Sequence, residues 1–258
     1  MKSFDVTNVN ELNASSLELK ITGNTNSLII NVDDDSQAKL LFLDANIENI
    51  TINAGEDSLV ILNFIHFNEH TSKQTINASF GSKVVVKEIA SNKIMLDSVF
   101  NLNGEHATID VSSLIVAKGF NSNLVQNAYH NAINSNSNIE NYGISLDNSE
   151  ITFNTTGKIY KGMRGSNCKQ LSRGIICGEK SAVKSLPILL IDEYDVHANH
   201  GAAIGKMSDD ELFYLMSRGL SNKEAFKLIL SGIINPFMDN LLDESLCDEI
   251  SSSIYSLI

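Results

Sequence analysis

The sequence predicts an all-β protein, a β-helix, that ends in a small helical subdomain. Three observations point to this fold class. Short apolar or alternating runs recur every ~8–12 residues between Leu17 and Ile191, polar turns separate them, and no amphipathic helical period lies between them. The periodicity becomes helical only after Lys206. We therefore expect a β-helix core over residues 1–206 and a helical subdomain over residues 207–258.

The expected strands resemble the strands of parallel sheets, which are buried on both faces. Apolar residues occupy consecutive positions, as in Leu40–Leu43 and Leu59–Leu62. Three- or four-residue corners such as Asp33–Ser36 and Ala54–Asp57 are more frequent than the two-residue turns of hairpins. Stacked coils that bury their interior against their neighbours explain this pattern, and a β-sandwich is the main alternative.

Asparagine is concentrated in the expected core. Twenty-five of the thirty asparagines precede residue 160, and no proline precedes Pro187. Asn and Asp tolerate the left-handed conformation at corners, and stacked coils allow their side chains to form ladders. Residues 1–186 therefore contain no proline, the residue that most commonly interrupts a strand.

Composition excludes several classes of protein. Hydrophobic residues make up 43% of the 258 residues, enough for a sizeable core, and the net charge of −12 argues against a general nucleic-acid binder. No apolar run approaches the ~18 residues of a membrane span, and the first residues contain no apolar segment of a secretory signal. Three cysteines form no disulfide framework, so we expect a reduced, cytoplasmic protein. Residues 158–184 carry seven basic residues and one acid, which is typical of a solvated basic face.

Three helices are expected after residue 206. Ser208–Glu211 and Ser221–Glu224 read as capping boxes that open the first two helices. Gly219 is expected to end the first helix, and the second should stop near Gly232. A third is expected over Asn235–Ile250, with proline in its first turn. The apolar faces of these helices have two interpretations: they cover the open end of the β-helix, or they dock a partner.

The densest polar cluster lies between Asp192 and Gly201 and contains His197 and His200. On a strand, these two histidines point to opposite faces, so only a bend between them brings both to one metal ion. Cys168 and Cys177 are the candidate companion ligands of a histidine site, but the chain has no C-x-x-C spacing, and buried cysteines in a β core are commonly inert. No phosphate-binding loop and no hydrolase motif occurs, so we expect no ATP hydrolysis by this chain alone.

The segment from Leu171 to about Ile234 resembles the C-terminal core of the SufB/SufD family of iron–sulfur cluster assembly proteins. The resemblance is carried by Leu171–Ile176, Pro187–Ile191, Asp195–Lys206 and, most specifically, Asp210–Ser221. It covers about a quarter of the chain. It implies a right-handed parallel β-helix with a C-terminal helical subdomain, in agreement with the pattern.

The resemblance also implies a function. Family members are non-enzymatic scaffolds that dimerise through the C-terminal end of the β-helix, dock a SufC-type ABC ATPase on their helices and build an iron–sulfur cluster, so a homodimer or a heterodimer with a second SufB/SufD subunit is expected. The Asn199–Ala202 segment is closer to SufD, because SufB has glutamate where Gly201 stands. SufB also carries a cysteine at the position of Ser181, and here Cys177 lies four residues earlier.

The resemblance assigns three sets of residues. His200 is expected to give a neutral imidazole to the iron of a transient cluster at the dimer interface, with Cys177 as the thiolate companion and Asp195, Glu193 or a carbonyl holding the second ring nitrogen. The dimer interface is expected around Pro187, Leu189 and Ala202. The ATPase is expected to dock on a surface formed by Leu212, Phe213, Tyr214, Met216, Arg218 and Phe226.

Two other functions compete with this one. The chain is alternatively a purely structural SufD-like subunit with no metal ligand of its own. The second alternative is a carbohydrate-active β-helix enzyme, but such enzymes need clustered carboxylates and aromatic platforms, and this chain contains no tryptophan.

Overall fold

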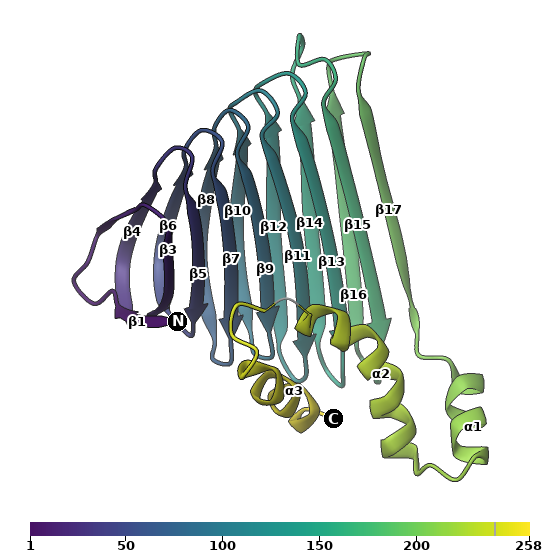
Figure 1. Ribbon diagram of the computed structural model, residues 1–258. Coiled ribbons are helices and arrows are strands. Elements are labelled where there is room, and N and C mark those ends of the chain that lie inside the picture. Colours follow the sequence, from purple (N-terminus) through teal and green to yellow (C-terminus); the bar gives the residue numbers. More distant parts are fainter. Residues whose placement is uncertain (240) are drawn as a thin grey trace.

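The computed structural model describes residues 1–239 and 241–258 and shows two parallel sheets wound into one β-helix (Figure 1). The chain alternates between the sheets, so each strand pairs in parallel with the strand two places further along. The nine-stranded sheet consists of β1 (Lys2–Asp5), β3 (Leu17–Thr22), β5 (Gln37–Leu43), β7 (Leu59–His66), β9 (Lys83–Ala90), β11 (Thr108–Ala117), β13 (Asn136–Ser145), β15 (Asn167–Ile176) and β17 (His197–Lys206). The eight-stranded sheet consists of β2 (Glu11–Ala14), β4 (Asn24–Val32), β6 (Asn46–Ala54), β8 (His70–Ala78), β10 (Ile94–Leu102), β12 (Asn121–His130), β14 (Glu150–Ile159) and β16 (Ala182–Ile191). The predicted β-helix is confirmed, and the parallel pairing excludes the β-sandwich.

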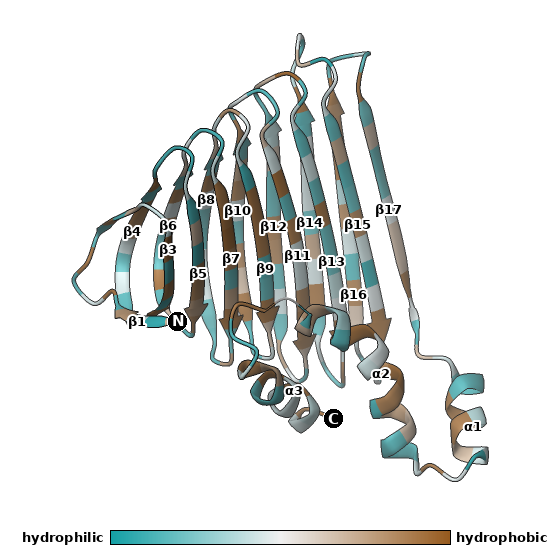
Figure 2. Ribbon diagram, viewed as in Figure 1, coloured by the Kyte–Doolittle hydropathy of each residue, from teal (hydrophilic) through white to brown (hydrophobic). Residues whose placement is uncertain are grey.

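The core lies in the lumen between the two sheets. Along β14, successive residues alternate between buried positions that face the lumen and partly exposed positions that face outward. Residues in register stack from coil to coil, and Ile52, Ile76 and Phe100 form one such buried column. Hydrophobic bands cross neighbouring strands at matching heights (Figure 2). Each fully buried side chain of this kind contributes roughly 1.5–3 kcal/mol, so the lumen holds the coils together.

The asparagines have the structural role that the sequence predicts. On the outer face of the eight-stranded sheet, Asn13, Asn31, Asn53, Asn77 and Asn101 form a ladder in which each Nδ2 donates to the Oδ1 of the preceding coil at 2.7–3.0 Å. At the corners, Asp35, Asp57 and Asn134 adopt positive φ angles of 51–56°.

The strands extend beyond the region where the pattern is clearest. β1 begins at Lys2, earlier than the expected Leu17, and β17 ends at Lys206. Strands lengthen from four residues in β1 and β2 to ten residues from β11 onward, so the coils widen toward the C-terminal end (Figure 1).

Three helices follow: α1 (Asp209–Ser217), α2 (Asn222–Met238) and α3 (Leu246–Ser256). Ser208 caps α1 by accepting a hydrogen bond from the Glu211 amide, and Ser221 forms a complete capping box with Glu224. Gly219, with φ +100°, follows the last turn of α1, as expected for a helix C-terminus.

The expected boundary between the second and third helices is wrong. α2 does not stop near Gly232 but continues to Met238 with Pro236 inside it, and the next helix begins only at Leu246. Leu230, Ile234 and Phe237 are buried along one face of α2, so their packing against the sheet keeps this turn helical. Pro236 removes one backbone hydrogen bond from the turn before it, and the burial of Ile234 and Phe237 on either side offsets this loss.

The helices cover a face of the β-helix and not its end. Leu230, Ile234 and Phe237 of α2, with Ile250 and Ile254 of α3, share one buried cluster with outward-facing residues of the nine-stranded sheet, among them Leu114 and Ile144. The Lys87 ammonium donates a hydrogen bond to the Phe237 carbonyl at 3.0 Å and another to the Asp239 carbonyl, which fixes the end of α2. The idea that the helices close the open end of the β-helix is therefore wrong.

The basic segment does not form one face. Lys169 pairs with Glu140 on the nine-stranded sheet, whereas Lys158 and Lys184 pair with acids on the other sheet. Among the described helices, none combines the length and the apolarity needed to cross a membrane.

Candidate functional site at the open end of the β-helix

The C-terminal end of the β-helix is open, because β16 and β17 are the last strands of their sheets (Figure 1). The outer edge of each strand has backbone N–H and C=O groups that no further coil pairs. Such an edge is able to pair with a strand of another chain.

The residues expected at the dimer interface lie together at this end. Register aligns Pro187 and Leu189 of β16 with Thr155 and Gly157, and Ala202 of β17 with the buried Ser172, so all three face the lumen. The outward positions of β16 hold a strip that the sequence reasoning did not single out. This strip consists of Leu186, Ile188 and Leu190, which are 55%, 48% and 48% exposed. The sequence contained a signal for this strip: in a strand over Ala182–Ile191, side chains alternate between the two faces, so these three residues share the face opposite to that of Pro187 and Leu189.

His200 lies in the middle of β17, is exposed, and pairs in register with Gln170 of β15. Since Gln170 is buried and faces the lumen, His200 points toward the open end of the lumen. His197 pairs with Asn167, and the odd spacing places it on the other face of the strand, as expected. The two histidines therefore do not meet.

Cys177 is distant from His200. It directly follows Ile176, the end of β15, and lies seven residues beyond Gln170, which places it roughly 20 Å from His200 at ~3.3 Å per residue. Burial raises the pKa of the Cys177 thiol to about 12, and the charge of Asp147 acts in the same direction. Cys177 and His200 of one protomer do not meet around one ion.

The structure brings a different cysteine near His200. Cys168 lies two residues before Gln170 on the same lumen-facing side of β15 and pairs with Ala198. Strand rise and strand spacing place its Cα about 8 Å from that of His200. Cys168 is fully buried, which raises the pKa of its thiol, while a hydrogen bond with Ser137 lowers it.

Gln170, the register partner of His200, carries a side-chain acceptor on the same lumen-facing side. Its Nε2 donates across the lumen to the Ile188 carbonyl at 3.2 Å, and its buried Oε1 has no hydrogen-bond partner in the described part of the chain. An unpaired buried acceptor is costly unless a donor reaches it. The acceptors expected from sequence lie at the corner before β17, where Glu193 already accepts amide hydrogens of Gly162 and Tyr194 that lower its pKa.

The described residues of one chain contain no group of three or more His, Cys, Asp or Glu side chains arranged to hold a metal ion. His200 therefore belongs to no such group within the described part of the chain.

The expected ATPase-docking residues divide into two groups. α1 buries none of its residues, and Phe213, Tyr214 and Met216 are 74%, 56% and 43% exposed. The Arg218 guanidinium lies over the Tyr214 ring at 5.3 Å, and Leu212 is half-buried. Phe226 belongs to the second group, because it is half-buried and packs against the cluster under α2 and α3. α1 lies beyond the sheets, beside α2 (Figure 1).

A comparison with known proteins identifies the family. The model of the SufBD core domain of the SUF iron–sulfur cluster assembly system matches residues 18–233. The chain belongs to the SufBD family. The match extends well beyond the segment that carries the resemblance in the sequence and includes most of the β-helix.

Individual SufBD proteins are similar over about two thirds of the chain. The iron–sulfur cluster assembly protein SufD of Bacillus subtilis is 33% identical over 159 residues, which cover 61% of this chain and 36% of SufD. SufB of the same bacterium is 28% identical over 174 residues, covering 67% of this chain and 36% of SufB. A SufBD family protein of Mycobacterium leprae is 29% identical over 167 residues, covering 64% of this chain and 18% of that protein. The chain thus covers about a third or less of the length of these relatives.

Proposed function

We propose that this chain is a non-enzymatic scaffold subunit of a Suf iron–sulfur cluster assembly system, with the cluster as its cargo. Membership of the SufBD family supports a role in iron–sulfur cluster assembly. The observation that carries the scaffold role is the division of surfaces: α2 and α3 cover part of the nine-stranded sheet, while the edges of the terminal strands and α1 stay uncovered. Two free surfaces are what a subunit with two protein partners needs.

The first partner is a second SufB/SufD subunit, either another copy or a related chain. It pairs with the open end through the edges of β16 and β17, because a two-fold axis satisfies both edges at once. The strip of Leu186, Ile188 and Leu190 adds apolar area beside these edges. Ile188→Lys should weaken the dimer in sedimentation velocity, whereas Met95→Lys, at a 39% exposed position of β10, should not. A monomer at all concentrations, with and without a related subunit, contradicts the pairing.

The cluster is held at this interface, with the His200 imidazole as a donor from this chain. Its second ring nitrogen needs an acceptor, and the unpaired Oε1 of Gln170 supports this arrangement. Cys168 is the nearest thiol of the same chain, and the second subunit supplies the remaining donors. The distance of Cys177 from His200 argues against its part as the companion ligand in the same protomer.

The second partner is a SufC-type ABC ATPase that docks on α1. Phe213 and Tyr214 provide large exposed aromatic surface, and Arg218 is already held over the Tyr214 ring. Aromatic and arginine anchors commonly dominate such interfaces. Phe226, on α2, packs against the buried cluster shared by α2, α3 and the sheet, so its part in docking is indirect.

The alternative of a purely structural SufD-like subunit is favoured by one observation, the lack of a three-donor group in the described residues of one chain. Anaerobic reconstitution of the purified dimer with iron and sulfide separates the two functions. A scaffold develops visible absorbance and stoichiometric iron that His200→Ala lowers and His197→Ala does not. Iron uptake that survives both His200→Ala and Cys168→Ser overturns the donor assignment, whereas a wild-type dimer that takes up no iron leaves the structural role.

A further inference from the structure

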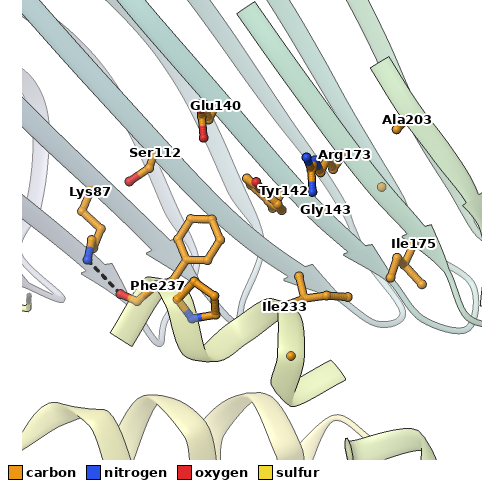
Figure 3. Close-up of a pocket in the computed structure, with 13 residues that line it drawn as sticks. Lys87, Ser112, Glu140, Tyr142, Gly143, Arg173, Ile175, Ala203, Ile233 and Phe237 are labelled. Carbon is orange, nitrogen blue, oxygen red and sulfur yellow. Dashed lines mark hydrogen bonds between the residues drawn. The ribbon is translucent and has the colours of Figure 1, made fainter. Parts of the chain in front are cut away.

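A cleft lies between α2 and the outer face of the nine-stranded sheet, away from the lumen (Figure 3). Its volume of about 440 Å³ falls within the range of sites for small molecules. The cleft is lined by Lys87, Ser112, Glu140, Tyr142, Gly143, Arg173, Gly174, Ile175, Ala203, Gly232, Ile233, Pro236 and Phe237.

The space exists because a helix position facing the cleft carries no side chain. Gly232 lies inside α2, and a Cβ built there meets no atom within 4 Å. Glycine inside a helix costs about 1 kcal/mol relative to alanine, so this position loses helix stability and leaves the cleft unfilled. On the sheet side, Ala203 contributes only a methyl group.

The walls of the cleft are apolar and aromatic. Ile233 and Phe237 come from α2, and Tyr142 and Ile175 come from the sheet (Figure 3). The Tyr142 and Phe237 rings meet edge to face at 4.9 Å between centroids, which fixes both rings at one side of the cleft. A flat or aliphatic body would be covered on both sides here.

The charge in the cleft is positive. The Arg173 guanidinium lies over the Tyr142 ring at 5.7 Å, and in the described part of the chain it forms no salt bridge. The one lining carboxylate, Glu140, is paired with Lys169 at 3.2 Å. The Lys87 ammonium is bound by the Phe237 and Asp239 carbonyls at the end of α2, where the helix C-terminus carries partial negative charge. Arg173 is therefore the lining cation that is left without an acidic partner in the described part of the chain.

We propose that this cleft binds a small organic anion, with its apolar body between α2 and the sheet and its acidic group on the Arg173 guanidinium. Arginine presents paired donors that suit carboxylate, sulfonate and phosphate groups. The site is distinct from the open end of the lumen and from the exposed surface of α1. The small organic anion would be a third kind of ligand for this subunit, beside its proposed protein partners and the iron–sulfur cluster.

The test is a fluorescence titration of the full chain with 1-anilinonaphthalene-8-sulfonate, an aromatic anion, and with its uncharged relative N-phenyl-1-naphthylamine. The sulfonate should bind saturably to one site. Arg173→Gln should raise its Kd about tenfold or more, because a charge-assisted contact is lost. The uncharged probe should bind about tenfold more weakly than the sulfonate and should not respond to Arg173→Gln.

Gly232→Leu supplies the second variant. Leucine has open space at this position and raises helix propensity, so the variant should melt no lower than the wild type while the sulfonate loses its site. Lys184→Gln, a basic position on the other sheet, is the matched control and should bind as the wild type does. The proposal is overturned if the sulfonate binds without saturation, if folded Gly232→Leu binds as tightly as the wild type, or if the uncharged probe binds equally well.

Discussion

Gln170 and His200 stand side by side on β15 and β17, with the glutamine buried and the histidine at the open end of the lumen. The Gln170 Nε2 donates a hydrogen bond to the Ile188 carbonyl, and the buried Gln170 Oε1 has no hydrogen-bond partner in the described residues. A histidine that binds a metal through one nitrogen needs an acceptor at the other. This pair therefore connects the interior of the coil to the proposed interface.

Replacement of Gln170 tests that connection. Gln170→Met keeps similar volume and removes the acceptor, so the iron content of the reconstituted dimer should fall about tenfold, at the lower end of the ~10–100-fold effect of outer-shell partners. Stability in urea should change by no more than about 1 kcal/mol, because the change removes one hydrogen bond but also an unsatisfied oxygen. Ser172→Ala, two residues further along the same face, is the control. Unchanged iron content in Gln170→Met shows that the glutamine does not position His200.

The α1 surface should be required for ATPase docking and not for folding. Phe213→Ser and Tyr214→Ser remove exposed side chains, so the far-ultraviolet circular dichroism and the melting temperature should stay unchanged. Loss of an aromatic anchor commonly costs ~2 kcal/mol or more of binding free energy, which corresponds to a Kd increase of about thirtyfold. Binding to the SufC-type ATPase is measured by calorimetry. Phe80→Ser, at a 44% exposed position outside the helices, is the control, and equal affinity of all three variants excludes α1 as the docking surface.

The asparagine ladder should stabilise the stacking of the coils. Asn77 donates to Asn53 and accepts from Asn101, so Asn77→Ala breaks two side-chain hydrogen bonds and leaves the Asn53 Oδ1 and the Asn101 Nδ2 without these partners. We expect a loss of about 1–3 kcal/mol in the free energy of unfolding by urea. Asn127→Ala, on the same sheet face but outside the ladder, should cost less than about 1 kcal/mol. Equal losses at the two positions refute a special contribution of the ladder.

The sequence predicts those parts of the molecule that depend on local pattern. The corners, the capping serines at 208 and 221 and the open end follow from turn chemistry, caps and the change of period near Lys206. The neighbours of His200 do not follow, because they depend on the register between β15 and β17, thirty residues apart. A shift by one residue would have turned Cys168 and Gln170 outward. The boundary at Pro236 was missed because packing of Phe237 against the sheet overrides the local signal of proline.

Acidification should destabilise the β-helix through two buried histidines. His70 is 8% exposed and stacks on His66, and His130 is fully buried between Ser135 and Ser137. Burial lowers the pKa of His70 to about 3, with the charge of His66 acting in the same direction. Burial also lowers the pKa of His130 to about 4, although its hydrogen bond with Ser135 opposes the shift.

The sign of the pH effect follows from these directions. Unfolded histidine takes up a proton near pH 6.5, whereas these two stay neutral in the folded chain until pH about 3 and 4. Their contribution is therefore complete above pH ~6.5 and falls below it by about 1.4 kcal/mol per pH unit for each histidine. Urea unfolding between pH 7.5 and 5 should show this slope, and His70→Asn should reduce it by about half. His106→Asn, at a solvent-exposed ring, should leave the slope unchanged, and a His70→Asn slope equal to that of the wild type contradicts the assignment.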